Sequence, residues 1–170
     1  MDVFEYYMKE ARRFLDEAEH IRTVSYPLAD DPKVFLSMLA KLHKSHKSIL
    51  SLLLHANRSS KASAHNLVKQ DFDSALKQAK SINEEQTIIS KPLFSTITTT
   101  HSLLNEHKQS PVEFPRQQEF VMCTPAYATT SISLEQVTSL SLQTKELLHE
   151  VFKQRDFFIT PTNKDHDFDS

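Results

Sequence analysis

Hydrophobic residues recur every three or four positions over most of the chain, with polar residues between them. This spacing places hydrophobic side chains on one face of a helix. The longest such stretch runs from Asp31 to Asn57, where Asp31 suits the N-cap and Pro32 the first helical position. Its hydrophobic face comprises Val34, Phe35, Met38, Leu39, Leu42, Ile49, Leu50, Leu53 and Leu54. We expect the rest of the chain to be organised around this helix.

The same periodicity predicts helices on both sides of this stretch. The first covers residues 2–24 and the third covers residues 60–82. A fourth starts at Pro92, and Ser133 caps the last helix. The link at residues 25–30 is short, so the first two helices should lie antiparallel.

The helical pattern breaks between residues 110 and 132. Three prolines in this segment, Pro111, Pro115 and Pro125, forbid a continuous helix. Two short strands, at 119–124 and 128–132, would form a hairpin across the link between them. An extended strap lying over the bundle fits the sequence equally well.

Together these elements predict a mostly α fold. It is an up-and-down bundle of four to five helices, with a short irregular or β-hairpin strap before the last helix. At 170 residues, 39% of them hydrophobic and 25% charged, the chain is long enough for one domain with a buried core. We place that domain at residues 1–159 and interpret residues 160–170 as a polar C-terminal tail.

The sequence contains no glycine. Phosphate-binding loops, dinucleotide-binding motifs and nucleophile elbows require a residue without Cβ at fixed positions, so none of them occurs here in its usual form. We therefore expect no nucleotide cofactor, and nothing in the sequence indicates another cofactor. Asparagine tolerates the left-handed conformation that ends many helices, so Asn57, Asn83 and Asn105 are the expected helix stops.

Three further features predict a cytoplasmic protein without a membrane segment. No hydrophobic run approaches the roughly 20 residues that a spanning helix needs. Residues 1–5 are acidic and amphipathic, unlike the basic start of a signal peptide. Cys123 is the single cysteine, so it cannot form an internal disulfide.

Charge is unevenly distributed, although the net charge is only −2. Residues 33–80 hold nine Lys or Arg against two Asp or Glu, and the segments on both sides are acidic. The candidate polyanion-binding residues are Lys33, Lys41, Lys44, Lys47, Arg58 and Lys61. RNA would fit such a cluster, because bound Lys and Arg release counterions from phosphates. A solvated basic face is the favoured alternative, because aromatic residues for base stacking are not interleaved with these charges.

The first helix has the pattern Tyr7-x3-Ala11-x2-Phe14-Leu15-x2-Ala18 and precedes a leucine-rich second helix. Over residues 1–60 the chain thereby resembles the small HEPN helical bundles, many of which are metal-independent ribonucleases. Their signature is an Arg with a polar neighbour, separated from a His by four to six residues. Arg58 and His65, with six residues between them, match it. The neighbour here is serine, and the motif lies between the second and third helices rather than near the end of the bundle.

The resemblance implies that His65 would act as a general base on a ribose hydroxyl while Arg58 steadies the phosphate. The segments at 110–114 and 120–123 also resemble those of uncharacterised prokaryotic helical proteins, which implies no activity.

Two histidines, His46 and His101, fall on hydrophobic helical faces. A metal site or proton relay would require them to face each other near a carboxylate. Hydrogen-bonded core histidines are the favoured interpretation, so no metal site is predicted.

Among the aromatic residues of the first turn, Tyr6 lies off the hydrophobic face and could mark a partner surface. Because catalytic motifs are missing, the leading hypothesis is a non-enzymatic protein–protein interaction or scaffold module, with homodimerisation through the first helix. RNA binding or HEPN-like RNA cleavage is the alternative.

Overall fold

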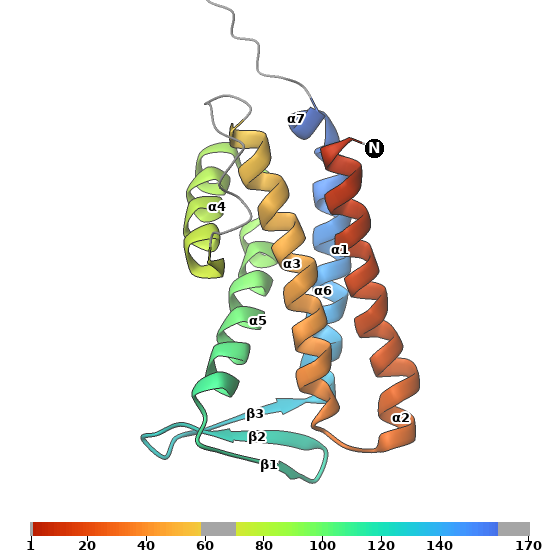
Figure 1. Ribbon diagram of the computed structural model, residues 1–170, viewed down its shortest axis with the longest axis vertical. Helices are drawn as coiled ribbons and strands as arrows, with labels where there is room; N and C mark the ends of the chain where they lie inside the picture. Colours follow the sequence, from red (N-terminus) through yellow and green to blue (C-terminus); the bar gives the residue numbers. More distant parts are fainter. Residues whose placement is uncertain (1, 59–70, 160–170) are drawn as a thin grey trace, which may run out of the picture.

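The computed structural model describes residues 2–58 and 71–159, and its long helices run alongside one another with a small sheet across one end (Figure 1). The long helices are α1 (Val3–His20), α3 (Val34–Arg58), α4 (Phe72–Gln86), α5 (Lys91–Gln109) and α6 (Leu134–Lys153). Two short helices, α2 (Tyr26–Ala29) and α7 (Arg155–Ile159), follow the first and the last of these. The prediction of a mostly α fold with β structure before the last long helix is confirmed.

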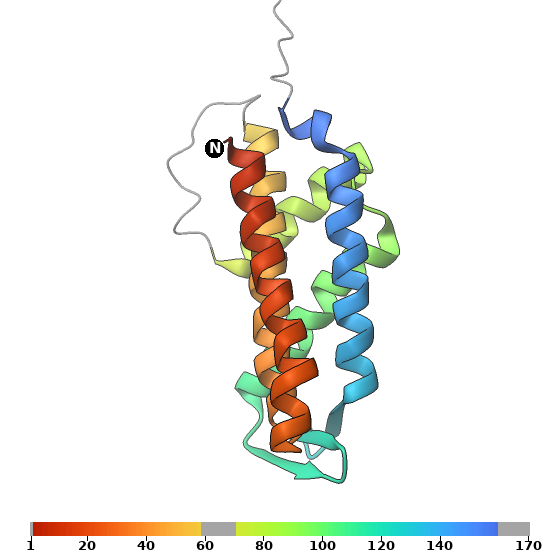
Figure 2. The ribbon, with the colours of Figure 1, turned by 90° about the vertical axis from the view of Figure 1, so that its right-hand side faces the viewer.

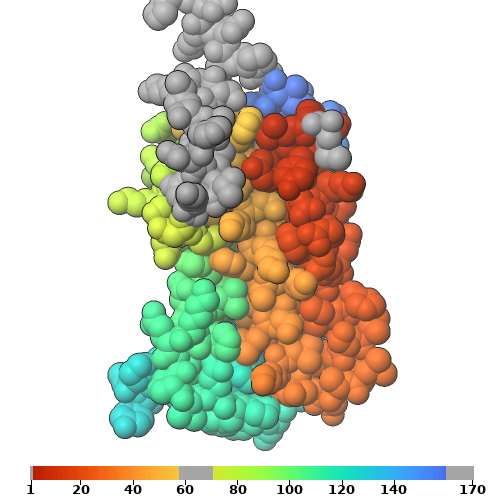
Figure 3. Space-filling view, in the orientation of Figure 1, coloured from red at the N-terminus to blue at the C-terminus, as the bar shows by residue number. Residues whose placement is uncertain are grey.

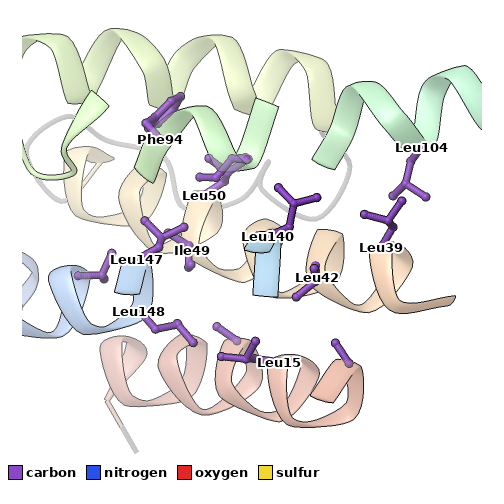
Figure 4. Close-up of a cluster of buried hydrophobic side chains, with 14 of the residues drawn as sticks. Leu15, Leu39, Leu42, Ile49, Leu50, Phe94, Leu104, Leu140, Leu147 and Leu148 are labelled. Atoms are coloured by element: carbon purple, nitrogen blue, oxygen red, sulfur yellow. The ribbon is translucent and has the colours of Figure 1, made fainter. Parts of the chain in front are cut away.

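Helix α3 is central, as expected, because α1, α4, α5 and α6 all pack against it. Figure 4 shows how its leucine and isoleucine side chains meet Leu15 of α1, Phe94 of α5 and Leu147 of α6. Full burial of each such side chain stabilises the fold by about 1.5–3 kcal/mol relative to exposure. Viewed from the side, α1 and α6 lie next to each other, with α7 beyond the end of α6 (Figure 2).

The first helical segment extends further than predicted. Asp2 caps α1 by accepting a hydrogen bond from the Glu5 amide at 2.9 Å, as expected. The predicted link at 25–30 is instead helical up to Ala29, because a π-helical turn at Ile21–Ser25 leads directly into α2. Pro27 lies in the first turn of α2, where its missing N–H needs no partner. The turn into α3 is correspondingly tight, and the two long helices are antiparallel (Figure 1).

The third predicted helix, 60–82, has different bounds in the structure. Residues 60–70 lie outside the described residues, and α4 runs from Phe72 to Gln86. Asp71 is its N-cap, since Asp71 Oδ1 accepts a hydrogen bond of 2.7 Å from the amide of Ser74. The prediction overlooked this cap because hydrophobic periodicity alone does not distinguish a capping residue from a helical one.

Asparagine does not end the helices, contrary to the prediction. Asn57, Asn83 and Asn105 all lie inside helical segments. Asn83 is buried and its side chain bonds both the N–H and the C=O of Ile89, at 2.7 and 2.8 Å. The left-handed residues of the described chain are Asp30, Thr87, Gln117 and Tyr127, with Asp30 and Thr87 at helix ends.

The predicted hairpin is present within a three-stranded antiparallel sheet, ordered β1 (Val112–Arg116), β2 (Glu119–Cys123) and β3 (Thr129–Ser133). The additional strand, β1, includes Pro115, which a strand tolerates at a sheet edge. Phe120, Met122 and Ile132 point into the core and close one end of the bundle. Ser133 then caps α6 through the Gln136 amide, as predicted.

Candidate functional site

A groove runs between α1 and α3, which lie side by side on the face shown in Figure 3. It has a volume of about 320 Å³ and is lined by Tyr6, Tyr7, Glu10, Phe14, Lys44, Lys47, Ser48 and Ser51. On each helix the lining residues follow the three- and four-residue spacing of one face. The hydrophobic face of each helix points into the core, so the groove residues lie at the solvent-exposed border of that face. We call this the α1–α3 groove.

Three aromatic rings form the α1 side of the groove. Tyr6 is 52% exposed and meets Tyr7 edge-on, with ring centroids 5.3 Å apart. Burial raises the pKa of Tyr7, so its hydroxyl stays a neutral donor at physiological pH. Phe14 carries Arg13 over its ring at 4.1 Å and Lys44 Nζ at 5.5 Å from its centroid. The groove therefore combines exposed ring surface with a lysine held against an aromatic face.

The carboxylates beside the groove are already engaged. Arg13 donates two hydrogen bonds to Glu10 and one of 2.6 Å to Glu17. Glu17 also accepts a hydrogen bond of 2.5 Å from Lys41 Nζ. The hydrogen bond from Arg13 lowers the pKa of Glu10, and that from Lys41 lowers the pKa of Glu17. Both carboxylates thus remain ionised and paired.

The two lysines of the groove differ from Lys41 in having no carboxylate partner within residues 2–58 and 71–159. Lys44 and Lys47 are both exposed, one turn apart on α3. With the neighbouring Glu10 neutralised by Arg13, the groove presents unpaired positive charge. This combination of ammonium groups, the hydroxyl of Ser51 and aromatic rings suits a planar ligand that carries phosphate.

The structure divides the predicted polyanion-binding residues. Lys44 and Lys47 line the groove, but Lys41 is held by Glu17 and Lys33 lies before the first residue of α3, roughly 16 Å along the axis from Lys44. The predicted set therefore does not act as one surface.

Arg58 is the last residue of α3, while His65 and Lys61 lie outside the described residues. The catalytic pair implied by the HEPN resemblance stays a prediction.

Sequence reasoning missed the aromatic half of the groove. The lysines were judged to lack interleaved aromatic residues because only their own segment was considered. Tyr6, Tyr7 and Phe14 come from α1, some 30 residues earlier in the chain, and the antiparallel packing of α1 on α3 brings them beside the lysines. The signal available in the sequence was the position of Tyr6 off the hydrophobic face of its helix.

A cluster of polar side chains lies on the opposite side of Lys47, where α3, α4 and α5 meet. His43 Nε2 is 3.1 Å from His101 Nδ1, and His101 Nε2 is 2.6 Å from Asp73 Oδ1. Asn105 is also within hydrogen-bond distance of His101. The Phe72 ring covers both imidazoles, with centroid distances of 4.0 Å to His43 and 4.4 Å to His101. Phe72 and Asp73 both belong to the first turn of α4, which the Asp71 cap holds in place.

The carboxylate of Asp73, at one end of this series, decides the direction of these hydrogen bonds. The side chain of Asp73 is 78% exposed, so it is an ionised acceptor and His101 Nε2 carries the proton between them. Asn105 Nδ2, itself a donor, lies 3.0 Å from the same Nε2. In the tautomer that the Asp73 carboxylate favours, His101 Nδ1 accepts a hydrogen bond from His43 Nε2–H. This leaves His43 Nδ1 with a lone pair that meets no donor in the part of the chain that the structure describes.

The environment of His43 keeps it neutral. Burial lowers its pKa to about 4, and the charges of Lys108 and Lys47 act in the same direction. Asp73 opposes them. At physiological pH His43 is therefore an unprotonated imidazole close to two ammonium groups.

His46 was predicted as a hydrogen-bonded core histidine, and this is confirmed. It is fully buried, and its Nε2 lies 2.9 Å from Thr144 Oγ1. Thr144 donates its own hydroxyl proton to the carbonyl of Leu140, so His46 Nε2 is the donor. The buried Nδ1 of His46 finds no partner within residues 2–58 and 71–159. His101 does not face His46, and no group of three or more potential ligands for a metal is found among the described residues.

These features define a class of protein: a helical bundle whose central helix borders an aromatic and basic groove and, next to it, a histidine cluster. None of the described helices has the length and hydrophobic run needed to cross a membrane. Comparisons of the chain with protein families, with curated proteins and with solved structures found no match.

Proposed function

We propose that the protein binds single-stranded RNA in the α1–α3 groove. The observation that carries this proposal is the meeting of three aromatic rings from α1 with two lysines from α3 that have no carboxylate partner among the described residues. Unstacked bases bind to aromatic faces, and lysines placed beside them bind the backbone phosphates. The volume of about 320 Å³ lies at the small end of the range for ligand sites, which suits one nucleotide unit of a longer strand.

Double-stranded RNA fits the groove less well. Its bases are stacked and paired, so Tyr6 and Tyr7 would have no exposed base faces to contact. An acidic peptide would use the lysines but not the rings. The proposal therefore takes up RNA binding, the alternative that the sequence offered, in place of the leading hypothesis of a protein–protein interaction or scaffold module.

Fluorescence anisotropy with a labelled uridine-rich RNA of about a dozen nucleotides tests the proposal. Tyr6→Ala should weaken binding about fivefold to a hundredfold, because one base loses its stacking surface. Tyr127→Ala is the matched control, since Tyr127 is 94% exposed in the loop between β2 and β3, away from the groove. Equal affinity of the Tyr6→Ala variant and the unmodified protein would overturn the proposal.

Salt titration tests the lysines separately. Two phosphate contacts should give a slope of at least about −1.4 in log affinity against log salt concentration, and Lys47→Ala should reduce its magnitude by about 0.7. Lys33→Ala, which changes a lysine just before α3 and outside the groove, should leave the slope unchanged. A single-stranded DNA of the same sequence shows whether the ribose contributes.

The homodimer through the first helix stays a prediction, and light scattering can test it separately from RNA binding. A dimer that covers Tyr6 would compete with RNA for the same face. Light scattering with and without RNA separates the two, because RNA binding to the groove would then convert dimers into monomers. A protein that is monomeric at high concentration would contradict the dimer and leave the RNA proposal intact.

A further inference from the structure

The side chains of the histidine cluster are linked by hydrogen bonds as well as by packing. Asp73, His101 and His43 form one hydrogen-bonded series across three helices, in which the Asp73 carboxylate favours a proton on His101 Nε2. In such a series the carboxylate orients the first imidazole, and the first imidazole orients the second. The open end is His43 Nδ1, an unprotonated nitrogen.

The cluster adjoins the α1–α3 groove through Lys47. This lysine lines the groove and lies one helical turn after His43 on α3, so the two residues are about 6 Å apart along the helix axis. Lys108 of α5 also lies close enough to His43 to lower its pKa electrostatically. An RNA strand that leaves the groove past Lys47 would therefore pass close to His43.

We propose that His43 is the general base of an RNA-cleaving site, in which Lys47 and Lys108 hold the scissile phosphate and Asp73 and His101 position His43. This inference rests on the proposed RNA binding. It places the catalytic base on a residue other than His65, which the resemblance to HEPN proteins implied.

The reaction is a transesterification within the RNA. His43 Nδ1 removes the proton of a ribose 2′-hydroxyl, and the 2′-oxygen forms a bond to the adjacent phosphorus. The bond between phosphorus and the 5′-oxygen breaks, and that oxygen takes a proton from water. The hydroxide left behind is neutralised by the proton that His43 releases. The products are a 2′,3′-cyclic phosphate and a 5′-hydroxyl, with no oxidation or reduction.

The bound phosphate would also make His43 a better base. Lys47 and Lys108 both lower the pKa of His43 in the free protein, and a phosphate between them offsets their charge. The rate should consequently rise with pH below the ordinary histidine value of about 6.5 and level off above it. Asp73→Asn removes a charge that raises the pKa of His43, so it should move this rise to lower pH.

The experiment measures binding and cleavage in the same samples. An RNA labelled at its 5′ end is incubated with the full chain, and the products are identified by mass spectrometry. His43→Gln should slow cleavage about a hundredfold or more while binding by anisotropy stays unchanged. His149→Gln, the same change at an exposed histidine on α6, is the matched control and should cleave normally.

A second test leaves the protein untouched and so does not depend on folding of a variant. Replacing single riboses of the RNA by deoxyribose should abolish cleavage at those positions and preserve binding. If RNA binds but is not cleaved, or if His43→Gln cleaves as fast as the unmodified protein, the catalytic inference is wrong and the binding proposal stands. If RNA does not bind, the proposed function fails as well.

A purely structural role for the cluster predicts a different outcome. His43→Gln and Asp73→Asn would then lower the melting temperature through weaker docking of α4, with no cleavage in the unmodified protein. That result would overturn the inference.

Discussion

His43 and His46 lie three residues apart on the same helix and have opposite environments. His43 is half-buried, faces α4 and α5, and belongs to a polar series that ends at exposed Asp73. His46 is fully buried, faces α6, and has one hydrogen bond, to Thr144. The difference teaches that the neighbouring helix, rather than the residue type, decides whether a histidine is available for chemistry.

The largest loss of stability should come from removing the buried imidazole of His46. His46→Ala removes a wholly buried ring, so we expect the free energy of unfolding to fall by about 3 kcal/mol. His46→Leu fills the space and removes the unpartnered Nδ1, so it should cost far less. Urea denaturation measures both. A larger loss for leucine than for alanine would contradict the packing role of His46.

The next largest effect should be the loss of stability on acidification, which depends on His46. Burial lowers the pKa of His46 to about 3, so the folded protein keeps this ring neutral while the unfolded chain binds a proton below about pH 6.5. The stability from this site is complete above that value and is lost as pH falls toward the folded pKa, by about 1.4 kcal/mol per pH unit. His46→Leu should reduce the slope of unfolding free energy against pH by this amount. Parallel curves for the two proteins would refute the assignment.

A smaller effect is expected where α4 begins. Asp71→Ala removes the cap that holds Phe72 and Asp73 beside the histidines, and should lower the melting temperature by about 2–4 °C. Imidazole nitrogen shifts measured by NMR should change for His43 and not for His46. Asp2→Ala, which removes the equivalent cap of α1, is the control: it should destabilise the protein without changing the shifts of His43.

The smallest effect on stability is expected at Arg13. It is exposed and pairs with Glu10 and Glu17, so Arg13→Ala should leave the melting curve nearly unchanged. It should nevertheless weaken RNA binding, because the released carboxylate of Glu10 then faces the strand. A variant with normal RNA affinity would show that these carboxylates do not influence the groove.

Much of the fold was predictable because hydrophobic periodicity directly encodes burial. On α3, residues such as Phe35, Leu42 and Leu53 were assigned to the core, and all three are completely buried. Helix ends were less predictable, since they depend on contacts across turns. Asn83 was expected to stop a helix, but its hydrogen bonds to Ile89 instead fix the turn that follows, and the left-handed residue is Thr87.

The candidate sites were predictable only in part, because each joins segments far apart in sequence. The lysines of the groove were identified from their spacing, whereas Tyr6 and Tyr7 required knowledge of how α1 packs on α3. A pairing of His101 with a second histidine near a carboxylate was considered, but with His46 as the partner. Three residues correspond to a rotation of roughly 60° short of a full turn, which separates His43 and His46 between two different neighbouring helices.

The turns of this glycine-free chain have a practical consequence. Thr87 holds a left-handed conformation with φ of 52°, which is unfavourable for a side chain branched at Cβ. Substituting glycine there would relieve local steric crowding at the link between α4 and α5, far from every lysine and tyrosine proposed to contact RNA. Thr87→Gly should therefore raise the melting temperature of the protein without altering RNA binding.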